Sequence, residues 1–116
     1  MIKNSKLIFY IFSIFFIFLI NNVLANQKLK IGLLVPISEN NQEIGHQIIK
    51  AVRMAIKDID SDNIEIIIKD TKSNSKKTLK SALELKEENV RIVIGPVFYE
   101  NLEYLNEVDD LIFLSL

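Results

Sequence analysis

Four short apolar runs follow one another along the chain after residue 28 and predict buried β-strands. They cover residues 29–35, 64–69, 90–94 and 111–116. Pro36 ends the first run and Gly95-Pro96 the third, because proline has no backbone N–H to donate to a β-ladder. The side chains that we expect among the most buried are Ile31, Leu33, Val35, Ile66, Ile92 and Ile94.

Between these runs, apolar residues recur every three or four positions, which predicts amphipathic helices. The first helix carries its stripe from Ile44 to Ile59, and Asn40 and Glu43 have the spacing of a capping box at its start. The second covers 78–88, with a cap at Asn74 or Ser75. We expect Leu79, Ala82 and Leu83 on its buried stripe and Leu85 off it. A weaker helical pattern covers 102–108.

Strands and helices therefore alternate in the order β-α-β-α-β-α-β with short links. This alternation predicts right-handed crossovers and a parallel sheet with helices on both faces. The continuous apolar character of the runs is typical of strands that are covered on two sides. The predicted fold is α/β, a doubly wound parallel sheet in a three-layer αβα arrangement, with the first strand inside and strand order 2-1-3-4.

The N-terminal segment has the pattern of a secretory signal peptide. Lys3 and Lys6 precede residues 7–20, which are apolar apart from Ser13, and small or medium side chains follow up to Ala25. We expect cleavage between Ala25 and Asn26, so that 1–25 is the signal peptide and 26–116 the exported part. The alternative is an uncleaved anchor, but a membrane-spanning helix needs about 20 apolar residues and this run is shorter.

Composition excludes several classes of protein. The chain has no Cys and one His, which excludes a disulfide framework, a thiolate metal site and a multi-histidine zinc site. Its net charge of −1 argues against nonspecific nucleic-acid binding, and 49% hydrophobic residues exclude a disordered tail.

In a doubly wound sheet, ligands bind beyond the carboxyl ends of the strands, which directs attention to the loops at 36–45, 70–75 and 95–101. No glycine-rich nucleotide loop and no nucleophile elbow follows any strand. Asp70 either binds a ligand or metal or shapes its own turn. His46 is expected as a surface side chain rather than a catalytic base. We therefore predict no enzyme, no metal site and no cofactor.

Four segments, in register along the chain, resemble the start of type 1 periplasmic binding proteins. They are Lys30-Ile31-Gly32-Leu33-Leu34-Val35-Pro36-Ile37-Ser38, Ile44-Gly45 with Met54-Ala55-Ile56, Asp70-Thr71-Lys72-Ser73-Asn74, and Val93-Ile94-Gly95-Pro96-Val97-Phe98. The nearest groups are the leucine/isoleucine/valine-binding proteins of ABC importers and the penicillin-binding protein activators. The resemblance covers the whole of residues 26–116.

This resemblance implies a periplasmic, two-lobed protein that closes around a small ligand, of which 26–116 would be the first part of the N-terminal lobe. The cleft-facing candidates that it implies are Ser38, Asp70, Val97, Phe98 and Tyr99. Amino-acid binders usually carry Ser where this chain has Tyr99, and Gly-Pro-Val-Phe is closer to the Gly-Pro-Leu-Phe of the activators. For Tyr99, packing in the cleft wall and contact with a ligand both remain open.

Two functions remain open, together with a third alternative in which the chain has no independent function. The first is the solute-binding component of a branched-chain amino-acid ABC importer, with an amino acid as ligand and a membrane permease as partner. The second is a regulator of peptidoglycan synthesis on the same fold, with a penicillin-binding protein as partner. The third is a truncated gene product without a function of its own.

Overall fold

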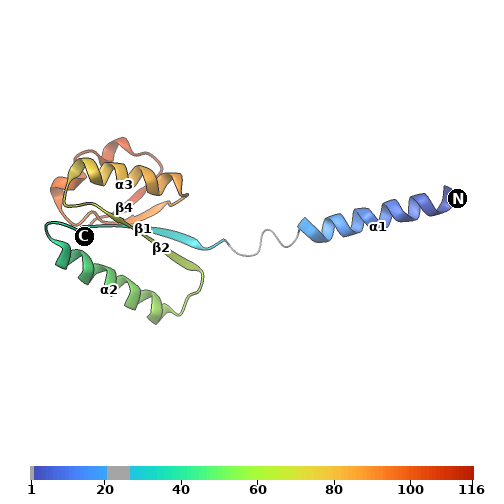
Figure 1. Cartoon of the computed structure of the whole chain (residues 1–116), viewed down its shortest axis with the longest axis horizontal. Helices are drawn as coiled ribbons and strands as arrows, with labels where there is room; N and C mark the ends of the chain where they lie inside the picture. Colours follow the sequence, from blue (N-terminus) through green and yellow to red (C-terminus); the bar gives the residue numbers. More distant parts are fainter. Residues whose placement is uncertain (1, 21–26) are drawn as a thin grey trace.

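The computed structural model describes residues 2–20 and 27–116, and Figure 1 shows an α/β unit with a helix, α1, lying apart from it. Helix α1 spans Ile2–Ile20. Among the described helices, none has both the length and the apolar character needed to cross a membrane. The expected cleavage point at Ala25 and Asn26 lies outside the described residues.

Strands and helices of the α/β unit alternate as the sequence predicts. Strands β1, β2, β3 and β4 span Leu29–Val35, Ile64–Asp70, Ile92–Ile94 and Ile112–Leu114. Helices α2 and α3 span Gln42–Ile59 and Ser75–Glu87. In place of the third predicted helix there are two 3₁₀ turns, η1 at Tyr99–Leu102 and η2 at Leu105–Glu107.

All four strands are parallel and their order is β2-β1-β3-β4. The predicted fold class and strand order are thereby confirmed. Val35 pairs with Asp70 in the β1–β2 register, so the carboxyl ends of these two strands lie side by side. This alignment brings together the loops that follow them.

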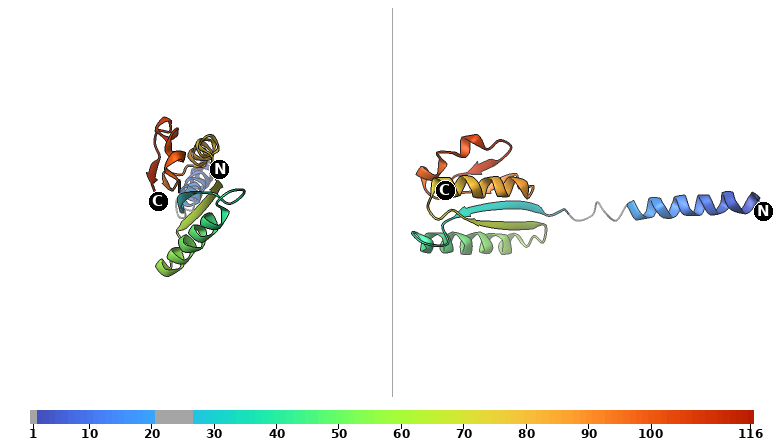
Figure 2. Two further views of the ribbon diagram at one scale, coloured as in Figure 1. Left: turned by 90° about the vertical axis from the view of Figure 1, so that its left-hand side faces the viewer. Right: turned by 45° about the horizontal axis from the view of Figure 1, so that its top comes forward.

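Helices lie on both faces of the sheet, with α2 on one side and α3 with the 3₁₀ turns on the other (Figure 2). On the α2 face, Leu33 and Val35 form a buried cluster with Ile49. On the α3 face, Leu34 and Val93 belong to a larger buried cluster, whose other buried members are Ala82, Leu85, Val90, Leu105 and Val108. The central strand β1 is therefore packed from both sides.

The burial prediction is correct for Leu33 and Val35, which are fully buried, and wrong for Ile31, Ile66, Ile92 and Ile94, which are half-buried. All six point to the α2 face, where α2 is the one described helix and cannot cover four strands. Over β4 this face is open, since Ile112 is 61% and Leu114 51% exposed.

The predicted stripe of α3 is also wrong in one respect. Leu85 is fully buried, whereas Leu83 is 42% exposed. The buried face of α3 includes the polar side chains of Thr78 and Ser81 and runs from them to Ala82 and Leu85. Gly32 on β1 has no side chain and leaves room for Leu85. A Cβ added at Gly32 would lie 2.6 Å from Cδ1 of Leu85.

The two helix starts differ from each other. Asn74 caps α3 as expected, with its side chain accepting a hydrogen bond from the Lys77 amide at 3.0 Å. The predicted capping box of α2 is wrong, because its N-cap is Asn41 in a left-handed conformation (φ 64°) without a side-chain cap.

Candidate functional site

The carboxyl end of β1 is held tightly against the first turn of α2. Gly45 is buried there, and a Cβ added to it would lie 1.6 Å from the carbonyl oxygen of Pro36. Only glycine permits this close approach of helix and loop. The backbone at Pro36 is therefore in direct contact with the first turn of α2, and Ser38 lies in the short loop between them.

Asp70, the last residue of β2, connects this loop to its own. One carboxylate oxygen accepts hydrogen bonds from the amides of Ile37 (3.0 Å) and Lys72 (2.9 Å). The other accepts the hydroxyl proton of Ser38 at 2.5 Å. Asp70 thus shapes its own turn and holds the neighbouring loop. Of the two roles that the sequence left open for Asp70, these contacts correspond to the shaping of its own turn.

The charge of Asp70 is stabilised by the same contacts. Burial by itself would raise the pKa of this carboxyl, but the hydrogen bonds from Ile37, Ser38 and Lys72 together outweigh it and hold the pKa below the usual value. The side chain is therefore an ionised acceptor at neutral pH. Because Ser38 gives its only proton to Asp70, its oxygen offers lone pairs in other directions.

Further contacts join the β1–α2 and β2–α3 loops. Ser73 accepts from the Asn41 side chain and donates to the Asn40 carbonyl, both at 3.2 Å. Lys72 forms an ion pair with Glu39 at 3.3 Å. Four non-glycine residues here have positive φ, which costs energy and is concentrated at functional sites in proteins: Glu39, Asn41, Lys72 and Ser73. We call the two joined loops, 36–41 and 70–73, the loop pair.

The loop after β3 turns sharply at Gly95, which has a φ of +105° and precedes a cis peptide bond to Pro96. A Cβ at Gly95 would lie 2.4 Å from the Leu34 carbonyl oxygen. Val97 then packs against the buried cluster on the α2 face, and the carbonyl of Phe98 accepts from the Asn101 amide at 3.0 Å. Val97 therefore contributes to packing, and the backbone of Phe98 contributes to the turn that follows.

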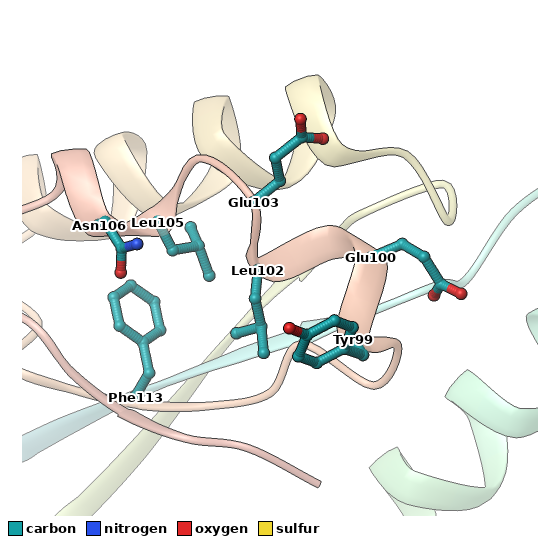
Figure 3. Close-up of a pocket in the computed structure, with 7 residues that line it drawn as sticks. All are labelled: Tyr99, Glu100, Leu102, Glu103, Leu105, Asn106 and Phe113. Carbon is teal, nitrogen blue, oxygen red and sulfur yellow. The ribbon is translucent and has the colours of Figure 1, made fainter.

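Tyr99 is 84% exposed, so its ring is not part of the core. It lines a hollow of about 640 Å³ between the 3₁₀ turns and β4. Figure 3 shows its ring beside Leu102, with Phe113 at the far end and the carboxylates of Glu100 and Glu103 pointing outward. The hollow thus has an apolar lining and an acidic rim.

The structure brings Ser38 and Asp70 into contact and positions Tyr99 separately. Among the described residues, no hydrogen bond joins Tyr99 to the loop pair. The role of all five candidates in ligand binding stays a prediction. Sequence reasoning missed Phe113 on β4 and Asn106 on η2 as lining residues. The two elements are separate in the sequence and come together around the hollow only in the folded state. Sequence reasoning also missed Asn101, which is 3% exposed and whose side-chain nitrogen has no partner among the described residues.

The part of the chain that the structure describes holds no group of three His, Asp or Glu side chains arranged to bind a metal ion. Asp70 uses its oxygens for amide and hydroxyl donors, and His46 lies exposed on α2. The chemistry available at the strand ends is therefore hydrogen bonding, apolar contact and negative charge.

Solved structures of several bacterial proteins have the same fold. The C-domain of LpoA from Haemophilus influenzae, a regulator of PBP1A, has 24% identity and a TM-score of 0.64, with 75% of this chain and 27% of that chain covered. LivJ from Streptococcus pneumoniae, a branched-chain amino acid transporter substrate-binding protein in complex with isoleucine, has 21% identity and a TM-score of 0.64, with 76% and 28% covered.

A third structure is a solute-binding protein of an ABC transporter from Rhodopseudomonas palustris, in complex with 3,4-dihydroxybenzoic acid. It has 24% identity and a TM-score of 0.70, with 78% of this chain and 27% of that chain covered. The chain thus spans about a quarter of the length of these proteins. At these identities the similarity concerns the fold.

No curated protein matches the sequence. A family model does, with the description "periplasmic binding protein", and the match covers residues 28–111. The match includes β1, β2 and β3, the loop pair and Tyr99, and it ends one residue before β4. The chain belongs to the periplasmic binding protein family.

Proposed function

We propose that the chain is part of the N-terminal lobe of a solute-binding protein that serves a branched-chain amino-acid ABC importer. The observation that carries this proposal is the position of the loop pair and of exposed Tyr99, which all follow carboxyl ends of parallel strands. LivJ, which has this fold, is in complex with isoleucine. The proposed role is binding rather than catalysis, without a cofactor.

In this proposal the strand ends form one wall of a cleft and a second lobe forms the other. Ser38 offers acceptor lone pairs beside an ionised carboxylate, which suits an ammonium or amide donor of a ligand. Tyr99 offers an aromatic face and a hydroxyl. Apolar Leu102 and Phe113 in the adjoining hollow suit a branched aliphatic side chain.

We place the protein in the periplasm, exported by residues 1–25 as a cleaved signal peptide, with 26–116 as the mature lobe segment. The support is the charged, apolar and small-residue order of residues 1–25 and the family of the rest. Mass spectrometry of the exported protein tests this. The expected mass is that of a protein whose first residue is Asn26. A mass that still includes residues 1–25 contradicts the proposal.

The ligand is tested by thermal unfolding of the longest protein that the gene encodes around this chain. Leucine, isoleucine and valine should raise its Tm, because a ligand that binds only the folded state stabilises it. Tyr99→Ala should abolish that increase, while Leu83→Ala, an exposed site on α3, should retain it. If none of the amino acids changes the Tm of the protein, the result contradicts the importer role.

A second function is favoured by the loop after β3. Val97-Phe98 follows Gly95-Pro96 as in penicillin-binding protein activators, and bulky Tyr99 stands where amino-acid binders usually have Ser. LpoA, a regulator of PBP1A, shares the fold. Under this alternative, amino acids leave the Tm unchanged, whereas a purified penicillin-binding protein binds the protein saturably.

A further inference from the structure

One flank of α2 carries a row of basic side chains that no part of the proposed ligand site uses. The row is His46, Lys50, Arg53 and Lys57, at intervals of four, three and four along one side of the helix. All four are exposed. Together with Ile49 and Met54 they line a shallow hollow of about 310 Å³, and no acidic side chain lines it.

Lys50, Arg53 and Lys57 of this row lie outside the ion pairs that the described residues form. Elsewhere in residues 27–116, three lysines form ion pairs: Lys69 with Glu84 and Glu88, Lys72 with Glu39, and Lys86 with Asp110. None of the ion pairs formed by the described residues includes Lys50, Arg53 or Lys57. The row therefore presents three exposed cations around a hollow that no acidic side chain lines, on a chain whose net charge is −1.

The position of the row follows from the handedness of the fold. A right-handed β1–α2–β2 crossover places α2 over β1 and β2, with Gly45 and Ile49 turned to the sheet. The right-handed winding of α2 then turns the basic row toward the free edge of β2. Figure 1 shows α2 on the outside of the unit, far from β4 and the 3₁₀ turns. The row is thus distinct from the hollow that Tyr99 lines.

We propose that the basic row of α2 is a docking surface for an acidic segment of a partner protein. Carboxylates at helical spacing would meet Lys50, Arg53 and Lys57, and an apolar side chain between them would contact Ile49 and Met54 in the hollow. The proposal does not depend on which ligand the cleft binds or on which of the two functions holds.

An anionic membrane surface fits this flank less well. Ile48, Ile49 and Val52 on the apolar face of α2 are packed on its own sheet, so they are not available for insertion between lipids. Three cations alone supply about 1 kcal/mol each at an anionic surface, which gives weak attachment. A hollow with an apolar floor is instead suited to a protein side chain.

The test uses the full chain in neutral detergent micelles and follows its backbone amide signals by NMR. The probe is a short helical peptide with four glutamates at spacings of three and four, and its glutamine counterpart is the control peptide. Saturable shifts are expected at residues 46–57 with the glutamate peptide and none with the glutamine peptide. Raising NaCl from about 50 to about 500 mM should weaken the binding, because salt screens exposed charges.

Two matched variants separate this surface from general charge. Lys50→Glu/Arg53→Glu should weaken peptide binding at least about tenfold, while Lys76→Glu/Lys80→Glu on α3 makes the same change of net charge and should leave it unaltered. All four residues are exposed, so both variants should keep the wild-type circular dichroism spectrum and Tm.

Three results would overturn the proposal. The first is an absence of peptide binding at low salt, and the second is an equal loss of affinity in both variants. The third is a response of residues 46–57 to phosphatidylglycerol in mixed micelles without a response to the peptide, which would assign the row to lipid. A failed amino-acid test of the ligand site would leave all of these results unchanged.

Discussion

At the scale of single residues, Asp70 determines how two loops are arranged. Its carboxylate receives donors from Ile37 and Ser38, more than thirty positions earlier in the chain, as well as from Lys72. The sequence identified Asp70 as a strand-end acid and left its role open. The contacts depend on the β1–β2 register, in which Val35 pairs with Asp70, and a pattern of neighbours along the chain does not contain that information.

We predict that Asp70→Asn flattens the acid branch of the stability curve. The pKa of Asp70 is lower in the folded state than its ordinary value of 3.8. The stability that its ionised form provides is therefore present above that value and is lost as pH falls through the depressed pKa. Urea unfolding between about pH 2 and pH 7 measures this.

Asp70→Asn should also cost roughly 1 kcal/mol or more at neutral pH, because charged hydrogen bonds are lost. The control is Asp62→Asn in the exposed turn before β2, which should keep the wild-type dependence on pH. An Asp70→Asn variant with the full wild-type loss of stability in acid would show that other carboxyls cause it.

At the scale of elements, agreement with the sequence is close for β1 and β2, whereas β4 has three residues where six were expected. β1 has the predicted bounds, and β2 extends one residue past its predicted end, because seven-residue strands pair along their whole length. β3 is three residues long where five were expected, and the 102–108 pattern forms two 3₁₀ turns. Leu102, Leu105 and Val108 are spaced by three, which also suits the three-residue period of a 3₁₀ helix.

Helix caps give a prediction at this scale. Asn74→Ala should destabilise the protein by about 1 kcal/mol, since it removes the acceptor for the Lys77 amide at the start of α3. Asn40→Ala is the matched control, because the side chain of Asn40 makes no cap and its carbonyl, which accepts from Ser73, is retained. Urea unfolding of both variants measures the difference, and equal stabilities would contradict the assigned cap.

Strand β4 gives a second prediction. Its outer side chains on the α2 face, Ile112 and Leu114, are exposed, and exposed apolar strands at a sheet edge promote aggregation. We expect residues 26–116 alone to be poorly soluble and Ile112→Lys to increase their solubility severalfold, since no buried contact is lost. Ile112→Val, which keeps an apolar side chain, should aggregate like the wild type in light-scattering measurements.

At the scale of the whole molecule, the arrangement of layers was predictable and the extent of their cover was not. Alternating strand and helix patterns are sufficient to predict the parallel sheet and its order. Whether an apolar strand is buried depends on which helices reach it, and this is why Ile92 and Ile94 differ from Leu33 and Val35. Positions beyond strand ends were likewise predictable, whereas the contact of Ser38 with Asp70 and the hollow beside Tyr99 depend on packing.

The last prediction concerns ligand binding by residues 26–116 alone. A cleft between two lobes surrounds most of its ligand, whereas the strand ends of a single lobe would supply one open wall. Ser38 and Tyr99 follow the ends of different strands, and no hydrogen bond among the described residues joins them. We therefore expect calorimetry with leucine, isoleucine and valine to give no saturable heat. Micromolar or tighter binding by this segment would show that the strand ends form a complete site, and the two-lobed account of the cleft would then be wrong.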